Sequence, residues 1–139
     1  KEDGLNLNVE AVFSSPSSLS WLGKPRPHVG LSAATDGAAT SQLYAGLGWQ
    51  ANLSPRYYAG FGFGFMIHDG ETRYRAGDPV LPDTAYLGCR VLARLSGEVG
   101  YRLTSRLSAA LYTTHASNAG VCGQNEGLDA TGFRLGYRF

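Results

Sequence analysis

Residues 129–139 read Asp-Ala-Thr-Gly-Phe-Arg-Leu-Gly-Tyr-Arg-Phe, and this stretch decides the fold. Large apolar residues occupy every second position, and glycine or arginine fills the positions between them. The apolar set is Phe133, Leu135, Tyr137 and Phe139, and the alternating set is Gly132, Arg134, Gly136 and Arg138. A period of two places these sets on opposite faces of a β-strand.

The same alternation recurs along the whole chain. It predicts seven strands, at about residues 5–13, 28–33, 43–50, 57–68, 91–100, 107–115 and 129–139. The segment 57–68 is the clearest. Its three phenylalanines (Phe61, Phe63, Phe65) share one face, and they alternate with three glycines (Gly60, Gly62, Gly64) that share the other. In a soluble sandwich these glycines would face water, whereas in a narrow barrel they relieve crowding inside while the phenylalanines meet lipid.

An aromatic residue closing the last strand resembles the assembly signal of outer-membrane β-barrels. We therefore predict one all-β domain over residues 1–139, an antiparallel up-and-down transmembrane β-barrel of the small eight-stranded type in the bacterial outer membrane. A soluble ligand-binding barrel is disfavoured, since its aromatic face would point inward. The 19 Gly, 8 Tyr, 6 Phe and 2 Trp suit strands and an aromatic girdle.

Seven strands are one short of an even number, which bacterial barrels show. The missing strand lies either within residues 14–27 or upstream of Lys1, and we favour the second. An open edge in lipid leaves backbone groups unpaired. Something would have to cover it: an unseen strand, a partner protein or a second copy of the chain.

Strand order predicts which connections share an end of the barrel. Counting back from Phe139, the loops at residues 69–88 and 118–128 are extracellular, and the turns at 54–55 and 104–105 are periplasmic. The connection at residues 14–27 is unusually long for the periplasmic side. Cys89 and Cys122 both lie beside extracellular loops, where they form either a disulfide or two free thiols.

Charge and hydropathy exclude other classes of protein. The net charge of +1 shows no bias toward nucleic acid. No apolar run approaches the ~20 residues of a membrane helix. The sequence indicates no metal and no cofactor.

A catalytic constellation occurs where the sixth and seventh predicted strands meet their connecting loop. His115 and Ser117 lie two apart on one face, roughly 6.6 Å along the strand, and Asp129 follows the loop on the same face. Ser117 is the candidate nucleophile, His115 the general base and then acid, and Asp129 the group that orients the imidazole. The alternative is that polar residues at a wet strand end serve no chemical purpose.

The residues His115-Ala116-Ser117-Asn118-Ala119-Gly120, followed by 125–129 (Asn-Glu-Gly-Leu-Asp), resemble the signature of the lipid A 3-O-deacylase (PagL) family. The resemblance implies an eight-stranded outer-membrane barrel that hydrolyses the 3-O-linked acyl ester of lipid A in lipopolysaccharide. It also implies an oxyanion hole built from Asn118, Ala119, Gly120 and Asn125. The chain departs from the best-known members in three ways: Asp129 stands where they carry Glu, a first strand is missing from the seven counted, and residues 121–123 (Val-Cys-Gly) insert a cysteine beside the site.

Other polar residues have two interpretations each. Arg73 and Arg75 either contact substrate phosphates or are solvated loop charges. His68 and Asp69 form either a second polar cluster, or His68 is a histidine that faces the barrel interior and has its hydrogen-bond partner there. Arg94, Glu98 and Arg134 point inward by parity and are predicted to form a charge network. The hypothesis for function is an outer-membrane lipid A esterase, and the alternative is a catalytically silent barrel that serves as a structural or accessory subunit.

Overall fold

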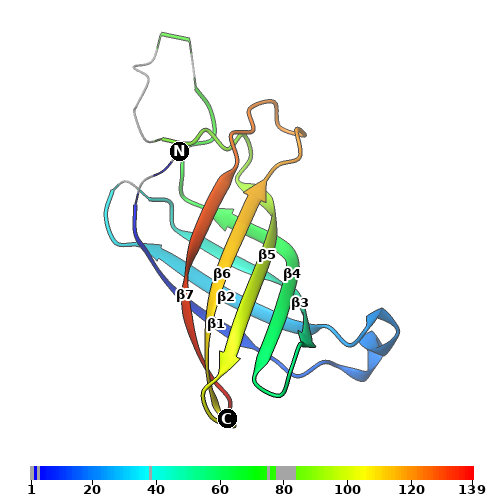
Figure 1. Ribbon diagram of the computed structural model, residues 1–139. Helices are drawn as coiled ribbons and strands as arrows, with labels where there is room; N and C mark the ends of the chain where they lie inside the picture. The colour runs from blue at the N-terminus through cyan, green and yellow to red at the C-terminus, as the bar shows by residue number, and fades with distance from the viewer. Residues whose placement is uncertain (1, 3, 38, 75, 78–83) are drawn as a thin grey trace.

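The computed structural model describes residues 2, 4–37, 39–74, 76–77 and 84–139. These described residues contain seven β-strands and one short 3-10 helix (Figure 1). The strands are β1 (Asn6–Val12), β2 (Arg26–Ala34), β3 (Gln42–Asn52), β4 (Tyr57–His68), β5 (Val91–Arg102), β6 (Leu107–Ser117) and β7 (Leu128–Tyr137), and the helix is η1 (Ser17–Leu22). All seven predicted strands are confirmed.

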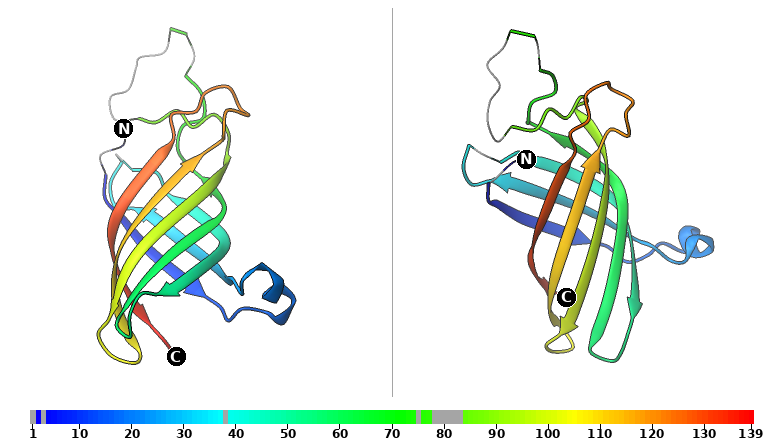
Figure 2. Two further views of the ribbon diagram at one scale, coloured as in Figure 1. Left: turned by 45° about the vertical axis from the view of Figure 1, so that its right-hand side comes forward. Right: turned by 45° about the horizontal axis from the view of Figure 1, so that its top comes forward.

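The strands form one antiparallel up-and-down sheet in the order of the chain, β1 to β7. Figure 2 shows the sheet curling round so that β1 and β7 approach each other. Within the described part of the chain no backbone ladder joins these two edge strands. Residues 14–25 contain η1 and no strand, and residues 26–27 already belong to β2, so the alternative of an eighth strand hidden in this segment is wrong.

Large apolar side chains cover the outside of the curled sheet. Phe61, Phe63 and Leu111 expose 52%, 44% and 52% of their surface, as do many other apolar residues on the same faces of β1 to β7. The prediction that the phenylalanine side faces outward is confirmed. Among the described residues, no helix combines the length and apolar character that crossing a membrane requires.

The inner face carries glycines opposite bulky side chains. A Cβ at Gly132 would lie 3.2 Å from the Tyr112 ring, and one at Gly60 would lie 2.8 Å from the Glu98 side chain. Gly30 and Gly100 face tyrosine rings even more closely. The inward glycines therefore make room in a narrow interior, as the sequence predicts.

Charged residues inside the sheet link its two edges. Arg134 on β7 donates from Nη1 to Glu10 on β1 at 3.0 Å and to Glu98 on β5 at 3.2 Å. Glu98 and Arg134 are thus confirmed as members of an internal charge network. Arg94 instead stacks its guanidinium over the Tyr44 ring, 3.8 Å from the centroid.

The two ends of the sheet differ. The longer connections after β2, β4 and β6 gather at one end, which we call the loop end; η1 and the short turns after β3 and β5 lie at the other, the turn end (Figure 2). The predicted grouping of connections is confirmed. The buried apolar cluster lies toward the loop end, where it unites strand residues with the β4–β5 loop: Tyr44, Met66, Ala85, Leu87, Leu92, Ala116 and Leu128.

Candidate active site

His115 and Asp129 are directly opposite each other in the β6–β7 ladder. Residues paired in this way project from the same face of a sheet. His115 Nδ1 lies 2.7 Å from Asp129 Oδ1, and both side chains are exposed on the outer face, by 48% and 79%. The Asp129 side chain, although one methylene shorter than glutamate, thus reaches the imidazole. An ionised Asp129 only accepts, so Nδ1 carries the shared proton and Nε2 is left to accept one.

Ser117 is the last residue of β6 and lies two positions after His115. Alternation puts its side chain on the same outer face, and it is half-buried. Within the described residues, no hydrogen bond joins Ser117 to His115. Catalytic hydrogen bonds often tighten only when substrate binds, so the shared face is the more informative observation.

Gly127 leaves the space beside the imidazole open. Its φ of +72° lies in the left-handed region that favours glycine. A Cβ at this position would lie 3.3 Å from His115 Cε1. A side chain here would therefore press on the imidazole from the loop side.

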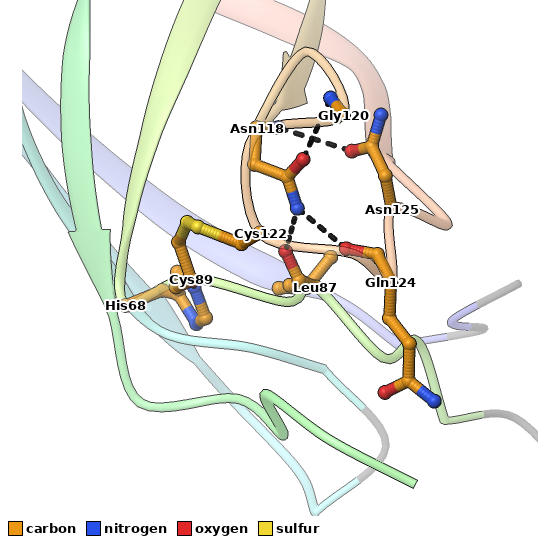
Figure 3. Close-up of a disulfide and its surroundings, with 8 residues drawn as sticks. All are labelled: His68, Leu87, Cys89, Asn118, Gly120, Cys122, Gln124 and Asn125. Carbon is orange, nitrogen blue, oxygen red and sulfur yellow. Dashed lines mark hydrogen bonds between the residues drawn. A yellow bond between two sulfur atoms is a disulfide. The ribbon is translucent and has the colours of Figure 1, made fainter.

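Asn118 follows Ser117 but is buried on the inner side of the sheet. Its Nδ2 donates to the carbonyl oxygens of Leu87 at 2.8 Å and Gln124 at 2.5 Å. Its Oδ1 accepts from the Gly120 N–H at 2.8 Å, and its own N–H donates to Asn125 Oδ1 at 3.0 Å (Figure 3). Asn118 therefore holds residues of the β6–β7 loop together and attaches this loop to the β4–β5 loop.

These bonds decide which predicted oxyanion groups are available. The Asn118 side chain and the Gly120 N–H are already paired with each other. Among the described hydrogen bonds, none uses the Ala119 N–H or Asn125 Nδ2. Ala119 has a φ of +53°, so its backbone is in the left-handed conformation two residues after Ser117.

Two further residues that the sequence analysis missed dock the β4–β5 loop on the β6–β7 loop. Gln124 Oε1 accepts from the Tyr74 N–H at 2.7 Å. Glu126 Oε2 accepts from the Tyr86 N–H at 2.7 Å, and the Glu126 N–H donates to the Tyr86 carbonyl oxygen at 3.3 Å. The spacing of two between Gln124 and Glu126 was the available signal, because it directs both side chains to one side of an extended loop.

Cys89 and Cys122 join the same two loops by a disulfide, with Cα atoms 5.6 Å apart (Figure 3). The bridge therefore ties the strand that begins at Val91 to the loop that carries the candidate oxyanion groups.

The other predicted residues lie apart from this site. Arg73 is exposed in the β4–β5 loop, and Arg75 lies outside the described residues. His68 is buried with Nε2 2.7 Å from the Cys89 carbonyl oxygen, and Asp69 accepts from the Ser41 N–H at 2.8 Å. His68 is thus an inward histidine with a backbone partner. Within the described ranges, no three His, Cys, Asp or Glu side chains gather as metal ligands would.

A family model described as lipid A 3-O-deacylase (PagL) matches residues 5–138. The match takes in all seven strands and both loops of the site. The chain belongs to the PagL family. No curated protein and no solved structure matches the chain significantly.

Membership of the PagL family implies lipid A 3-O-deacylase activity, which is a hydrolase reaction. The family resemblance that the motif at residues 115–120 indicated is confirmed. The chain also has the expected all-β fold, seen as a curled antiparallel up-and-down sheet of seven strands within the described residues.

Proposed function

We propose that this chain is an outer-membrane esterase that removes the 3-O-linked acyl chain of lipid A by a Ser-His-Asp mechanism. The observation that carries the proposal is the 2.7 Å contact between His115 Nδ1 and Asp129 Oδ1 on the apolar outer face, beside Ser117. A polar trio on that face has access to a substrate whose acyl chains lie in the membrane.

Each residue has a role that follows from its position. Ser117 Oγ attacks the ester carbonyl carbon while His115 Nε2 takes the serine proton. The imidazolium then gives this proton to the departing 3-hydroxyl oxygen of the sugar, which leaves an acyl-serine. Water attacks the acyl-serine with His115 again as base, and a free fatty acid leaves. Asp129 holds the tautomer and stabilises the imidazolium.

The developing oxyanion needs hydrogen-bond donors near Ser117. We assign this role to the Ala119 N–H and to Asn125 Nδ2, which no described hydrogen bond uses. Asn118 and Gly120 support the hole by fixing the loop that carries it. Preorganised donors of this kind are worth about 3–4 kcal/mol of transition-state stabilisation each.

The surroundings of the trio fit a lipid substrate. Leu95 lies opposite His115 in the β5–β6 ladder and is 41% exposed, and Phe133 and Leu111 continue the apolar surface along β6 and β7. We assign the exposed apolar belt to the hydrocarbon of the outer membrane, with the loop end at the outer surface where lipopolysaccharide resides.

Mass spectrometry of lipid A tests the proposal. Lipid A from cells that express the chain should lose the mass of one 3-hydroxy fatty acyl group, and cells with Ser117→Ala should keep it. Ser108→Ala is the matched control, since Ser108 lies on the same strand but faces inward beside Gly136. Deacylation that persists in Ser117→Ala excludes Ser117 as nucleophile. A folded wild-type barrel that leaves lipid A intact favours the silent structural subunit.

A further inference from the structure

Positive charge collects in the half of the sheet at the turn end, and the nearest acidic side chains, Glu10 and Glu98, lie at its inner border. Residues 11–27, 48–62, 99–112 and 133–139 form this half and contain no Asp or Glu. They contain seven basic residues: Lys24, Arg26, Arg56, Arg102, Arg106, Arg134 and Arg138. Only Arg134 among them is paired with carboxylates, those of Glu10 and Glu98 inside the sheet, within the described residues.

Three of these arginines line one cavity of about 630 Å³. Arg26, Arg102 and Arg138 share its wall with the polar side chains of Gln50, Asn52 and Ser54. The lining residues come from the start of β2, the end of β3 and the turn after it, the end of β5, and the residue that follows β7. We call this cavity the arginine basin.

The partners of the basin arginines are neutral. Arg26 Nε donates to the Phe13 carbonyl oxygen at 3.3 Å. Arg102 donates to Asn52 Oδ1 at 2.6 Å and to the Pro55 carbonyl oxygen at 3.4 Å. Neutral acceptors fix the guanidinium groups but leave their charge uncompensated, so an anion that enters the basin is attracted by all three.

Aromatic rings mark the level of the basin on the outer face. Tyr57 and Tyr101 pack with ring centroids 5.0 Å apart, and Tyr137 packs on Phe139 at 5.3 Å. Arg56 reaches the Tyr101 hydroxyl at 2.8 Å. The basin arginines Arg102 and Arg138 are sequence neighbours of these tyrosines and project from the opposite, inner face of the sheet. Tyrosine belts sit at the headgroup level of a membrane, so the basin lies at the rim of the interior at the depth of the phospholipid phosphates.

We propose that the arginine basin binds the phosphodiester headgroup of an anionic phospholipid in the leaflet at the turn end. Guanidinium groups bind phosphate oxygens in a bidentate manner, and Asn52 and Gln50 offer donors to a hydroxylated headgroup. This site lies at the opposite end of the strands from Ser117. It rests on the proposed membrane location but not on catalysis.

Native mass spectrometry of the full chain in neutral detergent tests the site. Titration with phosphatidylglycerol and with phosphatidylcholine of the same acyl chains should give preferential binding of the former. Arg26→Gln/Arg138→Gln should lower the affinity for phosphatidylglycerol about 5-fold per arginine removed. Arg138→Gln alone is the fallback, because no described hydrogen bond uses its side chain.

The control Arg56→Gln/Arg106→Gln removes the same charge from the same end but outside the basin, and it should bind phosphatidylglycerol nearly as the wild type does. An equal loss in the control would overturn the basin as the site. Displacement of the lipid by inorganic phosphate at matched concentration would overturn the lipid as its ligand. Ser117→Ala should bind phosphatidylglycerol normally, so a failure of the esterase proposal is distinguishable from a failure of this one.

Discussion

Ser117 and Asn118 are adjacent in the chain, and the contrast between them separates chemistry from scaffold. Ser117 ends β6 on the outer face, next to the exposed imidazole of His115. Asn118 turns inward, is 6% exposed, and uses both its side-chain amide nitrogen and oxygen to hold loops. Strand parity alone produces this division, because consecutive residues project to opposite faces.

The outer and inner sides of the end of β6 therefore have different roles. On the outer side, the His115 and Asp129 side chains are exposed and bind each other, and Ser117 is half-buried beside them. On the inner side, buried polar groups are paired, since an unpaired one costs about 1–3 kcal/mol. Substitutions on the outer side should therefore change rate, and substitutions on the inner side should change stability and rate together.

His115→Ala should have the largest effect on rate. Loss of the general base lowers kcat by a factor on the order of 10⁶, as in serine hydrolases generally. Thr113→Ala, on the same face two residues earlier, is the matched control and should retain activity. Release of 3-hydroxy fatty acid by the detergent-refolded protein measures both. Comparable activity in the two variants would remove His115 from the mechanism.

Asp129→Asn should have the second-largest effect on rate. We expect kcat to fall by a factor on the order of 10⁴, because an amide favours the wrong imidazole tautomer. Asp129→Glu should recover most of the activity, because a longer carboxylate still faces His115 across the ladder. Thermal stability should be little changed in both, since Asp129 is 79% exposed. An unaltered kcat in Asp129→Asn would show that the 2.7 Å contact has no catalytic role.

Asn118→Ala should combine a smaller loss of rate with a loss of stability. It leaves the Leu87 and Gln124 carbonyl groups without their donor, at about 1–3 kcal/mol for each buried group. We expect kcat to fall about 10- to 100-fold as the loop loosens, a cost of roughly 1–3 kcal/mol in the transition state. Heat-modifiable gel mobility measures stability. A fall in kcat with unchanged stability would make Asn118 a direct oxyanion donor.

Cys89→Ala/Cys122→Ala should affect rate least. The disulfide spans 33 residues, so its loss lowers the free energy of unfolding by about 2–4 kcal/mol. Asn118, Gln124 and Glu126 still hold the two loops together, so activity at low temperature should persist. The midpoint of thermal inactivation should fall. A rate loss as large as that of Asn118→Ala would make the disulfide the main fastener of the site.

Much of the fold could be predicted because alternation is a local signal. The segment 57–68 indicated both a strand and which of its faces points outward, and β4 has the same bounds in the structure. The His115–Asp129 pair was also predictable, since consecutive antiparallel strands bring the residues on either side of their connecting loop to one end of the sheet, and parity puts both on one face. The helix η1 gave no comparable signal, because its Ser-rich sequence has neither a period of two nor an apolar helical face.

The inward role of Asn118 could not be predicted because it depends on a partner remote in the chain. Leu87 belongs to the β4–β5 loop, whose path over the loop end carries no periodic signal. Parity did place Asn118 on the face opposite Ser117, so the inward direction was available. What was missing was the position of the carbonyl oxygens that it binds.

Covalent trapping of Ser117 tests the central claim most directly. A fluorophosphonate with a long alkyl chain, applied to the refolded protein, should add its mass to the peptide that contains Ser117, and His115→Ala should abolish the adduct. An adduct on another serine, or equal labelling of Ser117 without His115, would contradict the assignment of an outward-facing serine that His115 activates.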